Sequence, residues 1–120
     1  MGQVTTYQDI LRRLAIIDEK FASDKAGLAL GTPSDGLALD PKVAGLVRIG
    51  ALAAIGAPEV CLEWSTSEAL AAGATEEEVA DVLLTVAPLI GLGRLVAAAS
   101  GVAGGCGYDI DAALEDPEGL

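Results

Sequence analysis

Residues 69–91 read ALAAGATEEEVADVLLTVAPLIG and contain the clearest helix boundary in the chain. Gly73 is a typical helix end, because glycine readily takes the left-handed conformation that closes a helix. Thr75 and Glu78 form the capping-box pattern, in which each side chain bonds the backbone N–H of the other residue. A new helix is therefore predicted to begin after Thr75 and to continue through the apolar residues that follow. Pro88 is predicted to kink or end it, since proline has no N–H to donate.

Helical signals on both sides of this stretch predict an all-α fold. Asp40 and Pro41 are a favourable cap and first residue for an apolar helix that ends at Gly56. Residues 58–72 form the next predicted helix, and apolar residues recur at helical spacing over 7–22. The helix that Asp40 caps is apolar on nearly every face, so it is predicted to be buried on nearly every face.

The remaining segments are predicted from glycine, proline and charge. Residues 23–39 are rich in glycine and are predicted to be a loop with at most one helical turn. A last apolar helix is predicted after Arg94, and an acidic tail over about 104–120 is predicted to fray or to lie on a partner. The whole chain, residues 1–120, is thus predicted to be a single domain, a compact bundle of about five to six helices.

The chain is more apolar than one small core can bury. Hydrophobic residues make up 52% of the 120 residues, and a domain of this size leaves about a third of its surface exposed. The surplus predicts an oligomer, since contiguous exposed apolar surface marks an interface. A membrane is the alternative, because residues 82–107 carry a single charge, Arg94. Pro88, Gly91 and Gly93 interrupt this segment, which makes a spanning helix the less favoured alternative.

Charge and residue types exclude several function classes. The net charge of -11 disfavours nucleic acid as a partner, because binding its phosphates needs clustered Lys and Arg. Histidine, the commonest general base and transition-metal ligand, is absent. Cys61 and Cys106 do not have a metal-binding spacing, so neither a metal nor another cofactor is predicted. The first ten residues lack the regions of a secretory signal, which predicts a cytoplasmic protein.

The order of these helix starts resembles the carboxymuconolactone decarboxylase family, which includes the alkylhydroperoxidase D-like proteins. The resemblance covers about residues 39–100. It rests on LDPK at 39–42, an apolar helix, a cysteine-bearing helix, ALAAGATEEEV at 69–79, and Gly91 at the family's later glycine. It implies an all-helical fold that assembles into trimers or hexamers through apolar interfaces, in agreement with the apolar surplus.

The resemblance also implies where the family's chemistry would lie. Peroxidase-type members carry a CxxC motif on the third helix, a His four residues after its second Cys, and a Glu on the preceding helix. Counted back from Gly73, the second Cys corresponds to Cys61, the first to Pro58 and the His to Ser65. The Glu falls near residues 45–46, where no acid exists. Without a resolving thiol or a base, CxxC thiol peroxidase activity is not expected.

Polar groups on three of the predicted helices are candidates for a remaining site. We expect most of them to surround one pocket that takes a small anionic or carbonyl-bearing ligand. The candidate catalytic residues are Cys61, Ser65 and Glu68, and the candidate substrate-binding residues are Arg48, Glu63, Trp64 and Arg94.

Each of these candidates also has a purely structural interpretation. Arg48, the lone charge in the apolar run over 43–56, can hold a substrate carboxylate or form a structural ion pair with an acid of the next helix. Arg94 can line the same cavity or lie at a helix end on the surface. Trp64 can wall a pocket or pack in an interface, and Cys61 can be a small buried apolar residue.

The sequence thus favours a divergent family member that acts on or binds a small organic acid, lactone or carbonyl compound. Whether it is an enzyme stays open; if it is, a reaction of the lyase or isomerase type is expected. The alternatives are a non-catalytic oligomeric scaffold or binding protein on the same fold and, less favoured, a membrane-associated helical protein.

Overall fold

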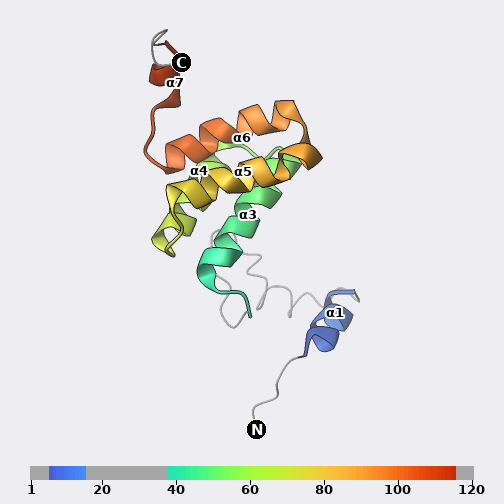
Figure 1. Cartoon of the computed structure of the whole chain (residues 1–120). Helices are drawn as coiled ribbons and strands as arrows, with labels where there is room; N and C mark the ends of the chain where they lie inside the picture. Colours follow the sequence, from blue (N-terminus) through green and yellow to red (C-terminus); the bar gives the residue numbers. More distant parts are fainter. Residues whose placement is uncertain (1–5, 16–37, 116–120) are drawn as a thin grey trace. The chain divides into compact units, whose positions relative to one another are not determined.

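The computed structural model describes residues 6–15 and 38–115, which form helices joined by short segments (Figure 1). No strand occurs among these residues, so the all-α prediction is confirmed. The chain divides into two compact units, Met1–Ala38 and Leu39–Leu120, and each is described by itself. The single domain over 1–120 stays a prediction. The described helices are α1 (Tyr7–Ala15), α3 (Pro41–Ile55), α4 (Glu59–Ala71), α5 (Glu76–Ile90), α6 (Leu92–Gly105) and α7 (Ile110–Glu115).

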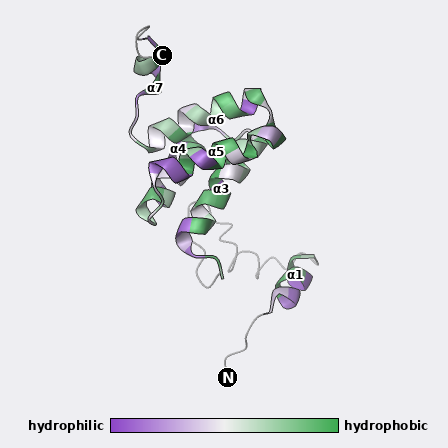
Figure 2. Cartoon of the chain, in the orientation of Figure 1, coloured by the Kyte–Doolittle hydropathy of each residue, from purple (hydrophilic) through white to green (hydrophobic). Residues whose placement is uncertain are grey.

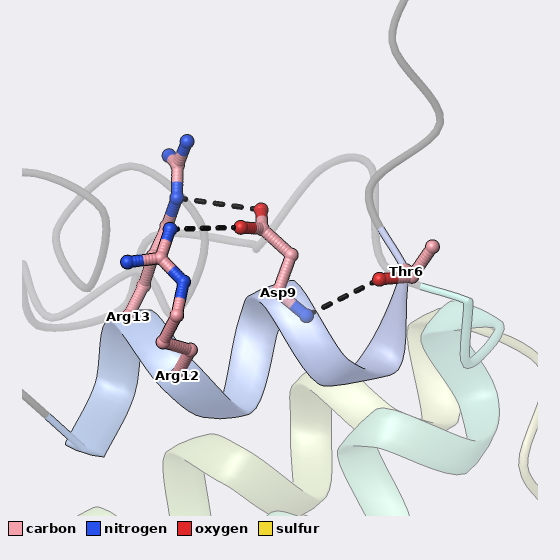
Figure 3. A network of polar contacts seen from close by, with 4 residues as sticks. All are labelled: Thr6, Asp9, Arg12 and Arg13. Atoms are coloured by element: carbon pink, nitrogen blue, oxygen red, sulfur yellow. Dashed lines mark hydrogen bonds and ion pairs between the residues drawn. The ribbon is translucent and has the colours of Figure 1, made fainter.

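α1 is a short amphipathic helix with a polar network on one side (Figure 3). The hydroxyl oxygen of Thr6 accepts a hydrogen bond from the N–H of Asp9 at 3.2 Å, which caps the first turn. The Asp9 carboxylate pairs with Arg12 at 3.1 Å and with Arg13 at 3.3 Å, one turn further along the helix. The predicted helix over 7–22 is confirmed as far as Ala15, and its remainder lies outside the described residues, as does most of the predicted loop over 23–39.

The predicted start and end of α3 are confirmed. The Asp40 carboxylate accepts a hydrogen bond from the N–H of Val43 at 2.9 Å, and Pro41 occupies the first turn, where its missing N–H costs nothing. Gly56 ends the helix with φ +69°, a left-handed conformation that glycine takes without a steric penalty.

The capping box of α5 is also confirmed. The Thr75 hydroxyl accepts from the N–H of Glu78, and the Glu78 carboxylate accepts from the N–H of Thr75, both at 3.0 Å. The helix before it, α4, begins after Pro58 and ends at Ala71, within one residue of the prediction at each end. Local side-chain chemistry therefore fixes the start of α5, whereas α4 begins after Pro58 without a side-chain cap.

The core of the second unit lies where α3, α4, α5 and α6 meet. Ile49, Leu62 and Val79, one from each of α3, α4 and α5, are among its largest fully buried side chains. Figure 2 shows that α3 and α6 are largely hydrophobic and that hydrophilic residues gather at the start of α5. The same four helices supply the surfaces on which a functional site can be built.

Glycines let α6 pack directly on the backbone of α4. A Cβ added at Gly101 would lie 2.7 Å from the Cβ of Leu62 and 2.8 Å from the carbonyl oxygen of Glu59. One added at Gly105 would lie 2.5 Å from the Cβ of Thr66. Side-chain carbons do not approach that closely, so only glycine permits this helix contact at these two positions.

α3 is less buried than its sequence predicts. Its buried residues are Gly45, Ile49, Gly50 and Ala53, which all face the neighbouring helices. The opposite face is open, and Ile55 is 71% exposed. The prediction that α3 is buried on nearly every face is therefore wrong for a single chain, because the three neighbouring helices cover only part of its circumference.

Two predictions near the C-terminal end are corrected: Pro88 does not end its helix, while a kink at Pro88 stays a prediction, and the tail does not fray throughout. α5 continues through Pro88 to Ile90, because the carbonyl that the proline leaves unbonded belongs to exposed Leu84 and can be hydrated. The tail predicted to fray over about 104–120 instead begins with the end of α6 and includes the short helix α7, where the Asp109 carboxylate accepts from the N–H of Ala112 at 3.1 Å. Within residues 6–15 and 38–115, no helix combines the length and the apolar character needed to cross a bilayer.

Candidate functional site

The three predicted catalytic residues lie on one stripe of α4. Cys61, Ser65 and Glu68 are four and three residues apart, which is the spacing of side chains on one helix face. Cys61 and Ser65 are half-buried, and Glu68 is exposed. The stripe runs beside the buried face of α4, so its side chains lie at the edge of the core rather than inside it.

The stripe also lies close to α3. A Cβ added at Gly45 of α3 would lie 3.0 Å from the Cβ of Ala69, which follows Glu68 on α4. Arg48 comes about one helical turn after Gly45 on α3, the helix that adjoins α4. The structure thus places a cation, a carboxylate, a hydroxyl and a thiol on two adjoining helices.

Arg48 and Arg94 do not share one environment. Arg48 is exposed, in contrast to the buried guanidinium that its apolar helix predicts, because it lies on the part of α3 that the other helices leave uncovered. It is nevertheless engaged in an interaction within the structure. Arg94 is also exposed, and its Nη1 donates a 2.7 Å hydrogen bond to the carbonyl oxygen of Ala54. It lies at the end of α3 and neutralises the negative end of that helix dipole.

The other two binding candidates lie on the more exposed side of α4. Trp64 is 47% exposed, so part of its ring is open to a ligand or to another protein surface. Glu63 is exposed, and its carbonyl oxygen accepts a 3.1 Å hydrogen bond from the Ser67 hydroxyl. A Cβ added at Gly104 would lie 3.2 Å from the Glu63 carboxylate, so this acid lies against α6 rather than beside Cys61.

The two cysteines among the described residues are not joined in a disulfide. Cys61 and Cys106 are both free thiols. Burial raises the pKa of the Cys106 thiol, and the negative charge of Glu76 adds to this effect. A thiol in this environment is a poor nucleophile at neutral pH, since the thiolate is the reactive form. In residues 6–15 and 38–115, no three His, Cys, Asp or Glu side chains are grouped to hold a metal ion.

A groove between α3 and α5 is a feature that sequence reasoning missed. It is open, has a volume of about 620 Å³, and is lined mostly by apolar side chains. Gly50 forms its floor, where a Cβ would lie 3.4 Å from Cγ1 of both Val82 and Val86. None of the seven predicted site residues lines this groove. Its lining residues are Leu46, Val47, Gly50 and Ala51 of α3 and Glu78, Asp81, Val82, Thr85 and Val86 of α5.

The polar groups that line the groove all belong to α5 and are spread along it. The Nζ of Lys42 lies 2.8 Å from a carboxylate oxygen of Glu78. The hydrogen bond from Lys42, and after it the backbone hydrogen bond from Thr75, lower the pKa of Glu78, and the same ion pair raises the pKa of Lys42. The Thr85 hydroxyl donates to the backbone carbonyl oxygen of Asp81 at 2.7 Å. The small residues Gly50 and Ala51 were the one sequence signal for the groove.

Comparison with known families decides what this helical unit is. The family model of the carboxymuconolactone decarboxylase family matches residues 28–104. The chain belongs to the carboxymuconolactone decarboxylase family. The match contains α3, α4 and α5 and nearly all of α6, and it confirms the resemblance predicted over about 39–100. Neither a curated protein nor a solved structure matches the chain.

All seven predicted site residues lie inside the part of the chain that matches the carboxymuconolactone decarboxylase model. α1 and α7 lie outside it, so among the described helices the match covers α3, α4, α5 and nearly all of α6. The part of the chain that matches the family therefore includes both the α4 stripe and the α3–α5 groove.

Proposed function

We propose that the chain is a divergent carboxymuconolactone decarboxylase-like protein that binds a small organic acid, lactone or carbonyl compound at the α4 stripe. The observation that carries the proposal is the placement of Cys61, Ser65 and Glu68 on one face of α4, with Arg48 on the adjoining helix. The site lacks the second thiol and the histidine of the family's peroxidases. CxxC thiol peroxidase activity is therefore not part of the proposal.

These side chains suit recognition of a carbonyl or carboxylate. A guanidinium binds a carboxylate through two parallel hydrogen bonds, which is the role proposed for Arg48. The Ser65 hydroxyl can donate to a carbonyl oxygen, and Glu68 can accept a proton from a carbon or oxygen of the ligand. An activity that follows from this set would be of the lyase or isomerase type, since it moves protons without a redox group.

The α4 stripe is open at the surface of one chain, and a neighbouring copy would close it. Glu68 is exposed and Trp64 is 47% exposed beside it. A homo-oligomer, a trimer or hexamer, would cover this surface, bury the apolar surplus, and exclude water from the site. Assembly is thus part of the proposed function.

A second candidate is a non-catalytic scaffold or binding protein on the same fold. It is favoured by Arg94, whose guanidinium bonds the Ala54 carbonyl oxygen instead of facing Arg48. It is also favoured by Glu63, which lies against Gly104 of α6. These contacts give two of the seven predicted site residues a structural role.

Ligand titration separates the two candidates. Succinate, pyruvate and γ-butyrolactone are added to ¹⁵N-labelled protein, and amide shifts are followed while turnover is monitored in the same sample. Binding at the α4 stripe should be lost in Arg48→Met and kept in Arg12→Met, the same charge change on α1. Equal affinity in both variants would discard the site. Binding without turnover favours a binding protein, and turnover favours an enzyme.

Thiol reactivity and assembly are tested separately. In Cys106→Ser the only thiol is Cys61, and its consumption of hydrogen peroxide should not exceed that of an ordinary protein thiol. Rapid, catalytic peroxide consumption would contradict the exclusion of peroxidase chemistry. Sedimentation equilibrium of the full chain measures the assembly, and a monomer at micromolar concentration would refute the oligomer.

A further inference from the structure

The α3–α5 groove is separate from the α4 stripe and has the character of a ligand site. Its volume of about 620 Å³ falls within the range of small-molecule pockets. Its walls are the aliphatic side chains of Leu46 and Val47 on one side and of Val82 and Val86 on the other. Gly50 has no side chain, so it leaves the space between these walls open. A hydrocarbon body can therefore lie along the groove and lose contact with water.

The charge at the groove is negative and is not balanced within it. The two ionisable groups that line the groove are Glu78 and Asp81. Lys42 pairs with Glu78 and neutralises it. The Asp81 side chain is exposed, and no cation pairs with it among the described residues. The groove thus combines an apolar trough with one uncompensated carboxylate at its rim.

The charge of the surrounding unit has the same sign. Residues 39–120 contain 13 acidic and 3 basic side chains. All three basic residues are engaged within the structure: Lys42 with Glu78, Arg94 with the Ala54 carbonyl, and Arg48 in a further interaction. At the α3–α5 groove, where the lining residues include no cation, this excess of acidic groups favours a cationic ligand over an anionic one.

From this geometry we propose that the α3–α5 groove is a binding site for a small aliphatic amine. The hydrocarbon chain lies over Gly50 between Val47 and Val82. The ammonium group lies at the rim beside the Asp81 carboxylate, where the Thr85 hydroxyl oxygen can accept a second hydrogen bond. The site goes beyond the proposed function, because its residues and its ligand charge both differ from those of the α4 stripe.

The test uses n-octylammonium as the probe on the full-length chain at pH 7. Its matched comparisons are n-octanoate, which has the same chain length and the opposite charge, and neutral 1-octanol. Amide shifts in ¹H–¹⁵N spectra locate the probe, and the titration gives its dissociation constant. The ammonium should bind most tightly and shift residues of α3 and α5. Its affinity should fall as the salt concentration is raised, because the charge contact lies at the surface.

Two variants test the residues. Asp81→Asn keeps the shape and removes the charge, and should weaken octylammonium binding roughly three- to fivefold, the worth of an exposed ion pair. Glu77→Gln, an equal charge change on the same helix outside the groove, should change the dissociation constant by less than about 1.5-fold. Ala51→Trp places a large ring over the groove and should abolish binding, with circular dichroism as the check of the fold.

Several outcomes would overturn the proposal. If octanoate bound as tightly as octylammonium, the charge of the ligand would not contribute to binding. If the amide shifts lay outside α3 and α5, the ligand would not bind in the groove. If Asp81→Asn and Glu77→Gln bound octylammonium with equal affinity, the proposed position of the ammonium group beside Asp81 would be refuted. Groove amides that shift on dilution without any ligand would show that a second copy of the chain covers the groove instead. None of these results depends on ligand binding at the α4 stripe.

Discussion

Replacement of Gly101 by alanine tests the packing of α6 on α4. The new Cβ would meet the Cβ of Leu62 at 2.7 Å and the carbonyl oxygen of Glu59 at 2.8 Å. Neither atom can rotate away, because one is a backbone oxygen and the other is fixed to the backbone of α4. The two helices must therefore separate, and the core between them must loosen.

The size of the effect follows from two opposing contributions. Overpacking of a well-packed core costs roughly 1–3 kcal/mol, and the rigid partners at Gly101 place the cost near about 3 kcal/mol. Alanine in a helix is favoured over glycine by about 1 kcal/mol. The free energy of unfolding should therefore fall by about 2 kcal/mol. For a helical unit of this size that corresponds to a fall in Tm of roughly 8–16 °C.

Gly93→Ala is the matched control, because it makes the same change on the same helix. A Cβ at Gly93 would have nothing within 4 Å, so this variant should be stabilised by about 0.5–1 kcal/mol. Urea unfolding followed by circular dichroism, at one fixed protein concentration, measures both variants. If Gly101→Ala were as stable as Gly93→Ala, the close contact between α4 and α6 would be refuted.

Three further predictions use the same unfolding assay. Thr66 is fully buried, and its Oγ1 has no hydrogen-bond partner among the described residues. The isosteric change Thr66→Val should therefore raise the free energy of unfolding by about 1 kcal/mol. A loss of stability would show that the hydroxyl is hydrogen-bonded. Thr75→Ala removes the capping box of α5 and should cost about 1 kcal/mol, whereas Thr75→Ser should cost little. The Lys42–Glu78 pair should lose its stabilisation at both ends of the pH range. Folding lowers the pKa of Glu78, so the stabilisation from Glu78 is present above its pKa in the unfolded chain and is lost as the pH falls through its pKa in the folded protein. Folding raises the pKa of Lys42, so the stabilisation from Lys42 is lost as the pH rises through its pKa in the folded protein. Glu78→Gln should flatten both limbs of a stability–pH curve, and an unchanged curve would contradict the ion pair.

Helix boundaries that depend on local side-chain chemistry were predictable from the sequence. The starts of α3 and α5 follow from Asp40 with Pro41 and from Thr75 with Glu78, because each cap bonds within three residues along the chain. The cap of α7 at Asp109 has the same local chemistry, but the surrounding glycines and acids favoured a frayed tail in the sequence analysis.

Features that depend on how helices meet were not predictable. The exposure of Arg48 is decided by which part of α3 its neighbours cover, and composition alone suggested burial. The α3–α5 groove exists because Gly50 lies against two valines of α5, a contact between residues more than thirty positions apart. The α4 stripe was predictable as a helix face, since the spacing of Cys61 and Ser65 fixes it. The position of the Arg94 guanidinium at the end of α3 was not predictable, because it depends on how α6 packs against α3.

The glycines of α6 also bear on how the chain folds. α6 contains four glycines, Gly93, Gly101, Gly104 and Gly105, which together make a helix over these residues about 4 kcal/mol less favourable than an alanine-rich one. The segment therefore has little tendency to be helical before α4 is in place, and it should acquire its amide protection late, as a unit that docks on an existing surface. Gly101 and Gly105, which allow the close contact with α4, thus also contribute to making α6 the first helix to be lost when that contact opens.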